Sequence, residues 1–220
     1  MRSASLPLRT LRAAVAEFGA EGPDASWRAL LDATTPAIDL SRAEHQQAML
    51  RWLNAWGCRI RYARPGEPDV AGAGLGQWWA MWAGSLPPAG ATLAELDDAV
   101  IDGLGPAYAA LVAVPMSGPP RARGLGSTAA TKLLYALRPA ALMPWDAAIA
   151  NALHGGRDAA AYVAHQRLGR DWAVGVLAEA GVDEPGLAAS FGAPDRTLAK
   201  MLDDYCYLAF TRGSMPTVGA

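Results

Sequence analysis

Cysteine, histidine and lysine are scarce in this chain, and long apolar runs are missing. Among its 220 residues are two cysteines, Cys58 and Cys206, and three histidines. The cysteines lie far apart and form no C-x-x-C pattern, and no histidine stands in metal-ligand spacing with them, so we expect neither a disulfide framework nor a metal site. Charged residues, glycine or proline interrupt every apolar stretch before it reaches the roughly 20 residues that span a bilayer. The sequence therefore predicts no membrane partner.

The overall composition is typical of a compact soluble protein and not of a disordered one. Apolar residues make up 52% and charged residues 18% of the chain, and residues 1–22 lack the continuous apolar segment of a signal peptide. We therefore expect one compact unit over residues 1–220, monomeric and cytoplasmic. Its net charge is −2 and its isoelectric point about 5.9, so binding to nucleic acid would need a local basic patch.

Start and stop signals along the chain predict an all-α protein. Ser41 and Glu44 form a capping-box pattern that opens a helix ending near Trp56. Thr92 opens a second helix, which ends near Gly103, and Pro106 begins a third. Further helices are expected at 127–138, 147–153, 158–168, 171–180 and 195–211, with N-caps at Asp146, Asp158, Asp171 and Asp195. Residues 58–62 alternate apolar and basic but have no second strand to pair with.

Residues 124–153 hold the most informative segment. Gly124-Leu125-Gly126 cannot be helical, whereas Ser127 is a good N-cap for the helix that Pro139 ends. At 100° per residue, Thr128, Lys132 and Tyr135 form a stripe roughly opposite the apolar face of that helix. Lys132, one of only two lysines among 19 basic residues, should therefore point to water or into a cleft. The short segment Met143-Pro144-Trp145 then delivers Asp146 to the start of the next helix, where the helix dipole favours its ionised form.

These features together resemble the helix-hairpin-helix DNA glycosylases, and more closely the small bacterial members similar to 8-oxoguanine glycosylase. The likeness covers about thirty residues: the Gly124-Leu125-Gly126 hairpin, the Thr131–Tyr135 helix motif, the Arg138-Pro139 stop and the Pro144-Trp145-Asp146 turn. It implies a two-lobed helical fold with the hairpin in a lobe at about 91–170 and a second lobe from the N- and C-terminal segments. It also implies DNA as the partner and excision of a damaged base, such as an oxidised purine, as the activity.

The resemblance assigns roles to particular residues. Lys132 would attack C1′ of the flipped nucleotide and Asp146 would stabilise the charge that develops on the sugar. The hairpin amides at Gly124, Gly126 and Ser127, with Arg121 and Arg123 beside them, would hold a DNA phosphate, together with a monovalent cation in some members; no other cofactor or metal is expected. Tyr135 and Trp145 would contribute to substrate binding. Thr128 stands where the bifunctional members usually carry the lysine, so Lys132 lies one helical turn further along.

Plainer interpretations of the same residues stay open. Lys132 could be a solvated surface residue, Asp146 a simple N-cap and the hairpin a tight turn. The tryptophans of segment 77–82 could stack on an extruded base or pack in the core, and the acidic pair Asp203-Asp204 is expected on a solvated face, with Lys200 pairing to Asp204 at i,i+4. The second functional class is accordingly a noncatalytic helical module that binds nucleic acid or a protein on the same scaffold.

Overall fold

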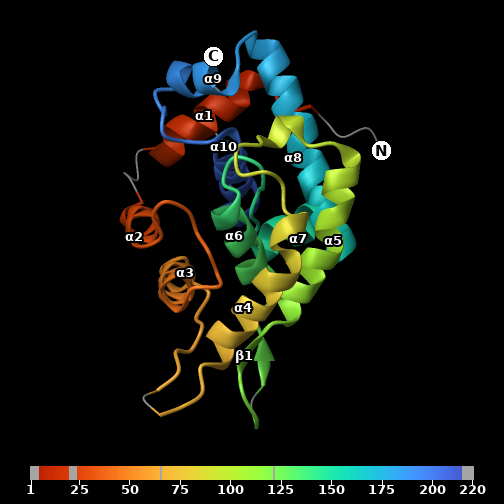
Figure 1. The fold of residues 1–220 in the computed structure, drawn as a ribbon. Helices are drawn as coiled ribbons and strands as arrows, with labels where there is room; N and C mark the ends of the chain where they lie inside the picture. The colour runs from red at the N-terminus through yellow and green to blue at the C-terminus, as the bar shows by residue number, and fades with distance from the viewer. Residues whose placement is uncertain (1–4, 20–23, 65, 121, 215–220) are drawn as a thin grey trace.

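Helices make up most of the structure (Figure 1). The computed structural model describes residues 5–19, 24–64, 66–120 and 122–214. Within these ranges there are ten α-helices: α1 (Leu8–Gly19), α2 (Ala25–Ala33), α3 (Ala43–Ala55), α4 (Val70–Trp82), α5 (Asp98–Ala113), α6 (Ser127–Leu137), α7 (Ala147–His154), α8 (Ala159–Ala180), α9 (Glu184–Ser190) and α10 (Leu198–Cys206). The 3-10 turns η1 (Ala83–Ser85) and η2 (Leu93–Glu95) and the π-helical turn η3 (Tyr207–Thr211) complete them. The predicted all-α class is confirmed.

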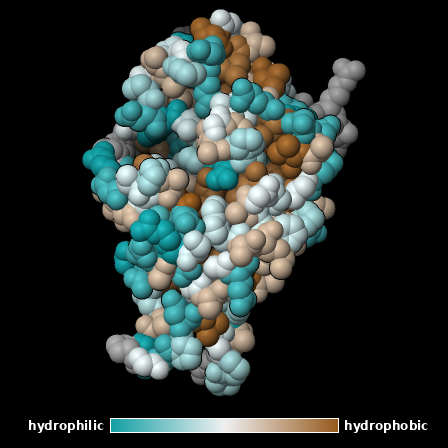
Figure 2. Space-filling view, viewed as in Figure 1, coloured by the Kyte–Doolittle hydropathy of each residue, from teal (hydrophilic) through white to brown (hydrophobic). Residues whose placement is uncertain are grey.

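One hydrophobic core joins the helices. Buried side chains from α1 to α10 and η3 belong to a single cluster. In Figure 1, α5 and α8 run side by side along one edge, α2 and α3 pack together at the opposite edge, and α6 and α7 lie between them. The structure therefore places the segment that carries Lys132 and Asp146 in the middle of the molecule. No helix of the described residues is both long and apolar enough to cross a bilayer. On the face seen in Figure 2, hydrophilic and hydrophobic residues are interspersed.

The first correction to the predicted elements concerns Pro106. One helix was expected to end near Gly103 and another to begin at Pro106. In the structure, α5 is a single helix of 16 residues with Pro106 inside it. Thr92 and Glu95 do form a capping box, although it opens only the short turn η2. Proline removes one hydrogen bond from a helix interior, and Pro106 lies on the exposed side of α5, where water can reach the unpaired carbonyl. Packing of α5 along α8 keeps the helix continuous.

Three predicted N-caps are also wrong. Asp171 lies inside α8, which spans 22 residues where two helices were expected, and its side chain pairs with Arg170. Thr197, not Asp195, caps α10. Ser41 bonds to Asp39 instead of capping α3. Asp171 and Ser41 each bond to a neighbouring side chain instead, and a local sequence pattern does not record that competition. Asp146 and Asp158 cap α7 and α8 as predicted.

The only sheet in the described part of the chain lies in a predicted linker. Strands β1 (Pro115–Ser117) and β2 (Arg123–Gly124) pair antiparallel just before α6. Residues 58–62 are not a strand, in keeping with the lack of a partner for them. Trp78 of α4 is buried and donates its indole N–H to the Ala107 carbonyl at 2.9 Å, so core packing accounts for this tryptophan of segment 77–82.

Candidate functional site

The glycine hairpin is closed by bonds to the end of α5. The Leu125 amide donates to the Val114 carbonyl at 2.9 Å and the Gly126 amide to the Val112 carbonyl at 3.1 Å. Gly126 has φ +82° and ψ 160°, a conformation that essentially only glycine adopts. A Cβ on Gly124 would lie 2.7 Å from the Val112 oxygen. Both glycines are thus required by the turn itself, whatever it binds.

Of the amides assigned to a phosphate, that of Gly126 is therefore already paired within the protein. Gly126 is the N-cap of α6 and has no side chain that could cap the first N–H groups of the helix. The amides of Ser127, Thr128 and Ala129 therefore remain available as hydrogen-bond donors. Ser127 and Thr128 are half-buried and Arg123 is exposed. Arg121 lies outside the described residues.

Lys132 is held against a residue from a distant part of the chain. Its ammonium donates to the backbone carbonyl of Trp56 at 2.6 Å and lies 5.4 Å from the centre of the Trp56 ring. Trp56 is the C-cap of α3, so its carbonyl is one that the helix leaves without an internal partner. The sequence left two environments open for Lys132, bulk water or a cleft; in the structure the side chain is half-buried and bonds to Trp56 from another part of the chain.

Tyr135, by contrast, does not share a polar stripe with Lys132. Its side chain is 5% exposed and lies among the rings of Trp27, Trp52 and Trp56. The reason is that α3 packs against this side of α6, so the face that looked polar in the sequence is covered. Burial raises the pKa of Tyr135 well above its usual value, and its hydroxyl stays protonated at neutral pH.

Trp56 is the centre of this arrangement. Its ring is half-buried and stacks on Tyr135 at 5.9 Å with an interplanar angle of 21°. Its indole N–H donates to a carboxylate oxygen of Asp24 at 2.8 Å. Burial opposes ionisation of Asp24, but hydrogen bonds from Ser26 and Trp56 lower the pKa of its carboxyl overall. We call the four rings of Trp27, Trp52, Trp56 and Tyr135 the aromatic cluster.

The second lysine of the chain approaches the same ring. The Lys200 ammonium lies 5.7 Å from the centre of the Trp56 ring and 4.6 Å from that of Phe18. Burial lowers the pKa of Lys200, but Asp203 and Asp204 more than compensate and raise it above its ordinary value. Lys200 is therefore a fixed cation, whereas a lysine nucleophile must give up its proton.

The acidic partners of Lys200 differ from the prediction. The i,i+4 pairing of Lys200 with Asp204 is confirmed, but Asp204 is fully buried and not on a solvated face. Asp204 also accepts a hydrogen bond from Arg196 at 2.9 Å, and Asp203 bonds to Lys200 at 3.0 Å. A buried carboxylate needs such partners, since an unpaired charge in the interior costs several kcal/mol or more.

Asp146 lies at the start of α7 with both carboxylate oxygens occupied. One oxygen accepts the Ile149 amide at 2.9 Å, as an N-cap does, and the other accepts the Thr211 hydroxyl at 2.6 Å. Asp146 is half-buried and Lys132 bonds elsewhere, so no ion pair joins the two predicted catalytic residues in the described structure. Thr211 belongs to η3, an irregular helical turn of the kind often found at functional sites.

Trp145, the residue before Asp146, is a core residue. It is 1% exposed, and its ring lies edge-on to Tyr108 at 6.0 Å and tilted against His165 at 5.2 Å. His165 bonds to the Pro144 carbonyl at 3.2 Å, and burial lowers the pKa of this histidine to about 3. The imidazole is therefore neutral and can donate its N–H to that carbonyl. This packing positions the turn that carries Asp146.

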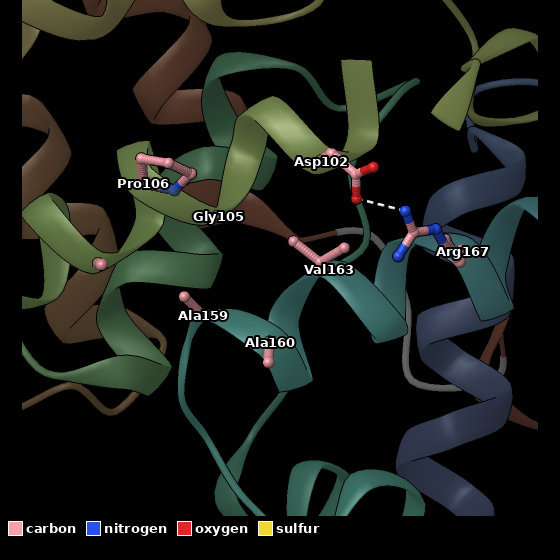
Figure 3. A pocket seen from close by; sticks show the side chains of 8 residues that line it. Asp102, Gly105, Pro106, Ala159, Ala160, Val163 and Arg167 are labelled. Atoms are coloured by element: carbon pink, nitrogen blue, oxygen red, sulfur yellow. Dashed lines mark hydrogen bonds and ion pairs between the residues drawn. The ribbon is translucent and has the colours of Figure 1, made fainter. Parts of the chain in front are cut away.

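A separate groove lies between α5 and α8 (Figure 3). It has a volume of about 460 Å³ and is lined mainly by small apolar residues such as Gly105, Ala159 and Val163. Asp102 and Arg167 also line the groove and meet there in an ion pair. Since these two charged groups neutralise each other, the groove offers little chemistry, and none of the predicted site residues lines it.

Trp56 and Asp24 were not among the site residues predicted from the sequence. A tryptophan at a helix end, four residues after Trp52 and directly before Gly57, was a signal available in the sequence, because the end of a helix leaves both a carbonyl and a ring edge open. Nothing local linked it to Lys132, which follows 76 residues later.

Comparison of the chain with protein-family models, with curated proteins and with solved structures finds no match.

Proposed function

We propose that this protein is a DNA glycosylase-like enzyme that excises a damaged base, with oxidised purines as the first class to test. The observation that carries the proposal is the placement of the Lys132 amine against the ring and carbonyl of Trp56, beside the aromatic cluster. Enzymes that act on a base take it out of the helical stack and hold it against aromatic or apolar surfaces. An amine next to such a surface is suited to reach the sugar of a flipped nucleotide.

Asp146 supports the same reaction class. Breaking a glycosidic bond leaves positive charge on the sugar, and a carboxylate placed nearby stabilises that charge. The Ile149 amide and the Thr211 hydroxyl orient the Asp146 carboxylate, so little reorganisation would be needed. In the proposed step the Lys132 nitrogen bonds to C1′, the bond from C1′ to the base breaks with its electron pair leaving on the base, and the lysine proton passes to the base or to water.

Lys132 must first leave the Trp56 carbonyl and lose a proton to water, because an ammonium nitrogen has no electron pair with which to attack carbon. Substrate binding at the aromatic cluster would have to displace this bond. The bond itself favours the second candidate function, a noncatalytic module on the same scaffold that binds nucleic acid through stacking and charge. In that module Lys132 serves only to join α6 to α3.

Borohydride trapping and base-release assays on duplexes with a panel of damaged bases distinguish the two functions. The enzyme should release a base, and Lys132→Gln should abolish any covalent trapping. Asp146→Asn should lower base release by about a hundredfold or more, as expected for one electrostatic group, while asparagine preserves the N-cap and therefore the fold. Arg9→Gln, an exposed position on α1, is the matched control and should leave activity unchanged. Duplex binding without base release from any substrate would favour the noncatalytic module.

A further inference from the structure

Arg59 has an unusual backbone conformation directly after the site. Its φ is +55°, and within the described residues it is the one non-glycine residue with a positive φ. At a positive φ the side chain lies too close to its own backbone, so this conformation is costly for most residues. It persists where the surrounding structure enforces it. Arginine has no local advantage here, unlike glycine or asparagine. The side chain itself therefore needs an explanation.

The surroundings do enforce the conformation. On one side, Gly57 at φ +80° ends α3, and the Cys58 amide returns to the Leu53 carbonyl at 3.0 Å. On the other side, the Asn54 side chain binds both backbone groups of Ile60: it accepts the amide at 2.5 Å and donates to the carbonyl at 2.8 Å. Arg59 is thus held between two fixed neighbours, and its position is reproducible rather than that of a free loop.

The charge around Arg59 is unbalanced. Residues 57–64 contain Arg59, Arg61 and Arg64 and no acidic residue. The nearest acid along the chain, Glu67, is used by the other two: Arg61 donates to both of its oxygens, at 2.8 and 2.9 Å, and the Arg64 amide donates at 3.0 Å. Within the described structure no carboxylate lies in ion-pairing distance of Arg59, whose side chain is exposed.

This free cation lies close in the chain to the candidate site. Trp56, three residues earlier, bonds to Lys132. Cys58, the residue immediately before Arg59, is near enough to Lys132 for that lysine to lower the pKa of its thiol, although burial raises it more. Lys132 bonds to Trp56 and Arg59 follows Trp56 by three residues in the chain. Two cations therefore accompany this tryptophan, against the one carboxylate of Asp24 that bonds to it, in a protein whose net charge is negative. A local excess of positive charge is what an acidic protein requires to bind a nucleic-acid backbone.

We propose that Arg59 is a phosphate-binding residue that holds the DNA backbone beside Lys132 and Trp56. The inference rests on the proposed function for its partner, a DNA duplex. A guanidinium donates two parallel hydrogen bonds to a phosphate, and contacts of this kind set the position of a protein on DNA without reading its sequence. The strained backbone would then be retained because it aims this side chain at the phosphate.

Arg59→Gly tests the inference, because it should change stability and binding in opposite directions. Glycine removes the backbone strain, so the urea midpoint of unfolding should rise. Binding to an undamaged duplex should weaken, and the slope of log affinity against log salt should decrease in magnitude by about one, as expected when one phosphate contact is lost. Arg59→Asn, which also tolerates this conformation and lacks the charge, should behave in the same way. Arg59→Lys should recover most of the salt slope, and Arg9→Gln is the charge-matched control.

The outcomes separate this inference from the proposed function. More stable Arg59→Gly and Arg59→Asn variants with unchanged affinity and unchanged salt slope would overturn it, and so would a wild-type protein that binds no duplex at low salt. A wild-type protein that binds duplex but releases no base refutes only the excision activity. In that case a smaller salt slope in both variants still supports Arg59 as a phosphate contact.

Discussion

The carboxyl group of Asp204 should make the stability of this protein fall as the pH rises from 4 to 7. Asp204 is fully buried in α10, where it meets Lys200 and Arg196. Burial raises its pKa from 3.8 to about 6, despite the opposing effect of Lys200. The folded protein therefore binds a proton that the unfolded chain has already released between these two values. The stability that Asp204 contributes is complete below pH 3.8 and is lost as the pH rises through 6.

The size of the effect follows from the two pKa values. Each tenfold difference in proton affinity corresponds to about 1.4 kcal/mol, so a rise from 3.8 to about 6 amounts to about 3 kcal/mol at neutral pH. Asp204→Asn matches the protonated side chain in size and cannot titrate. We expect wild type and variant to have similar free energies of unfolding near pH 4, and the wild type to become less stable than the variant by about 3 kcal/mol at pH 7.

Urea denaturation at pH 4, 5, 6 and 7, followed by tryptophan fluorescence, measures this difference directly. Glu95→Gln is a control of opposite sign, because hydrogen bonds from the Thr92 amide and hydroxyl lower the pKa of Glu95 below its ordinary value of 4.5. The wild type should gain stability over this variant only as the pH rises to about 4.5 and should keep that advantage unchanged up to pH 7. Parallel curves for wild type and Asp204→Asn would refute the reasoning. If the wild type instead becomes more stable than Asp204→Asn as the pH rises, the ion pairs to Lys200 and Arg196 lower the pKa of Asp204 by more than burial raises it.

Three further predictions concern the site and the thiols. Gly124→Ala places a Cβ 2.7 Å from a carbonyl oxygen of α5, so it should destabilise the fold by about 1 to 3 kcal/mol in urea unfolding; unchanged stability would show that the hairpin can move. Lys132→Met removes the half-buried bond to Trp56 and should cost about 1 to 2 kcal/mol with a change in fluorescence, whereas a solvated lysine would cost nothing. Burial raises the pKa of the Cys206 thiol well above its ordinary value, so Cys206 should react with a disulfide reagent only after unfolding; a native protein in which both Cys206 and Cys58 react rapidly contradicts this.

Features that depend on short-range contacts could be predicted from the sequence alone. The bounds of α6 follow from the glycines before it and Pro139 after it, and Asp146 and Asp158 cap their helices as expected. These features are set within one helical turn, where the chain itself supplies both donor and acceptor. The resemblance to the glycosylases also relies on this local segment, so the roles it implies for Lys132 and Asp146 remain predictions.

Everything that required a second segment was decided by tertiary structure. Pro106 and Asp171 look like helix boundaries locally, yet α5 and α8 run through them because each is packed along the other. The sequence places Tyr135 on the polar side of its helix, but α3 covers that side in the structure. Lys132 meets a carbonyl that lies 76 residues away in the chain. The energy of burial and of long-range hydrogen bonds depends on which surfaces meet, and a pattern within one segment carries no information about the segment that will cover it.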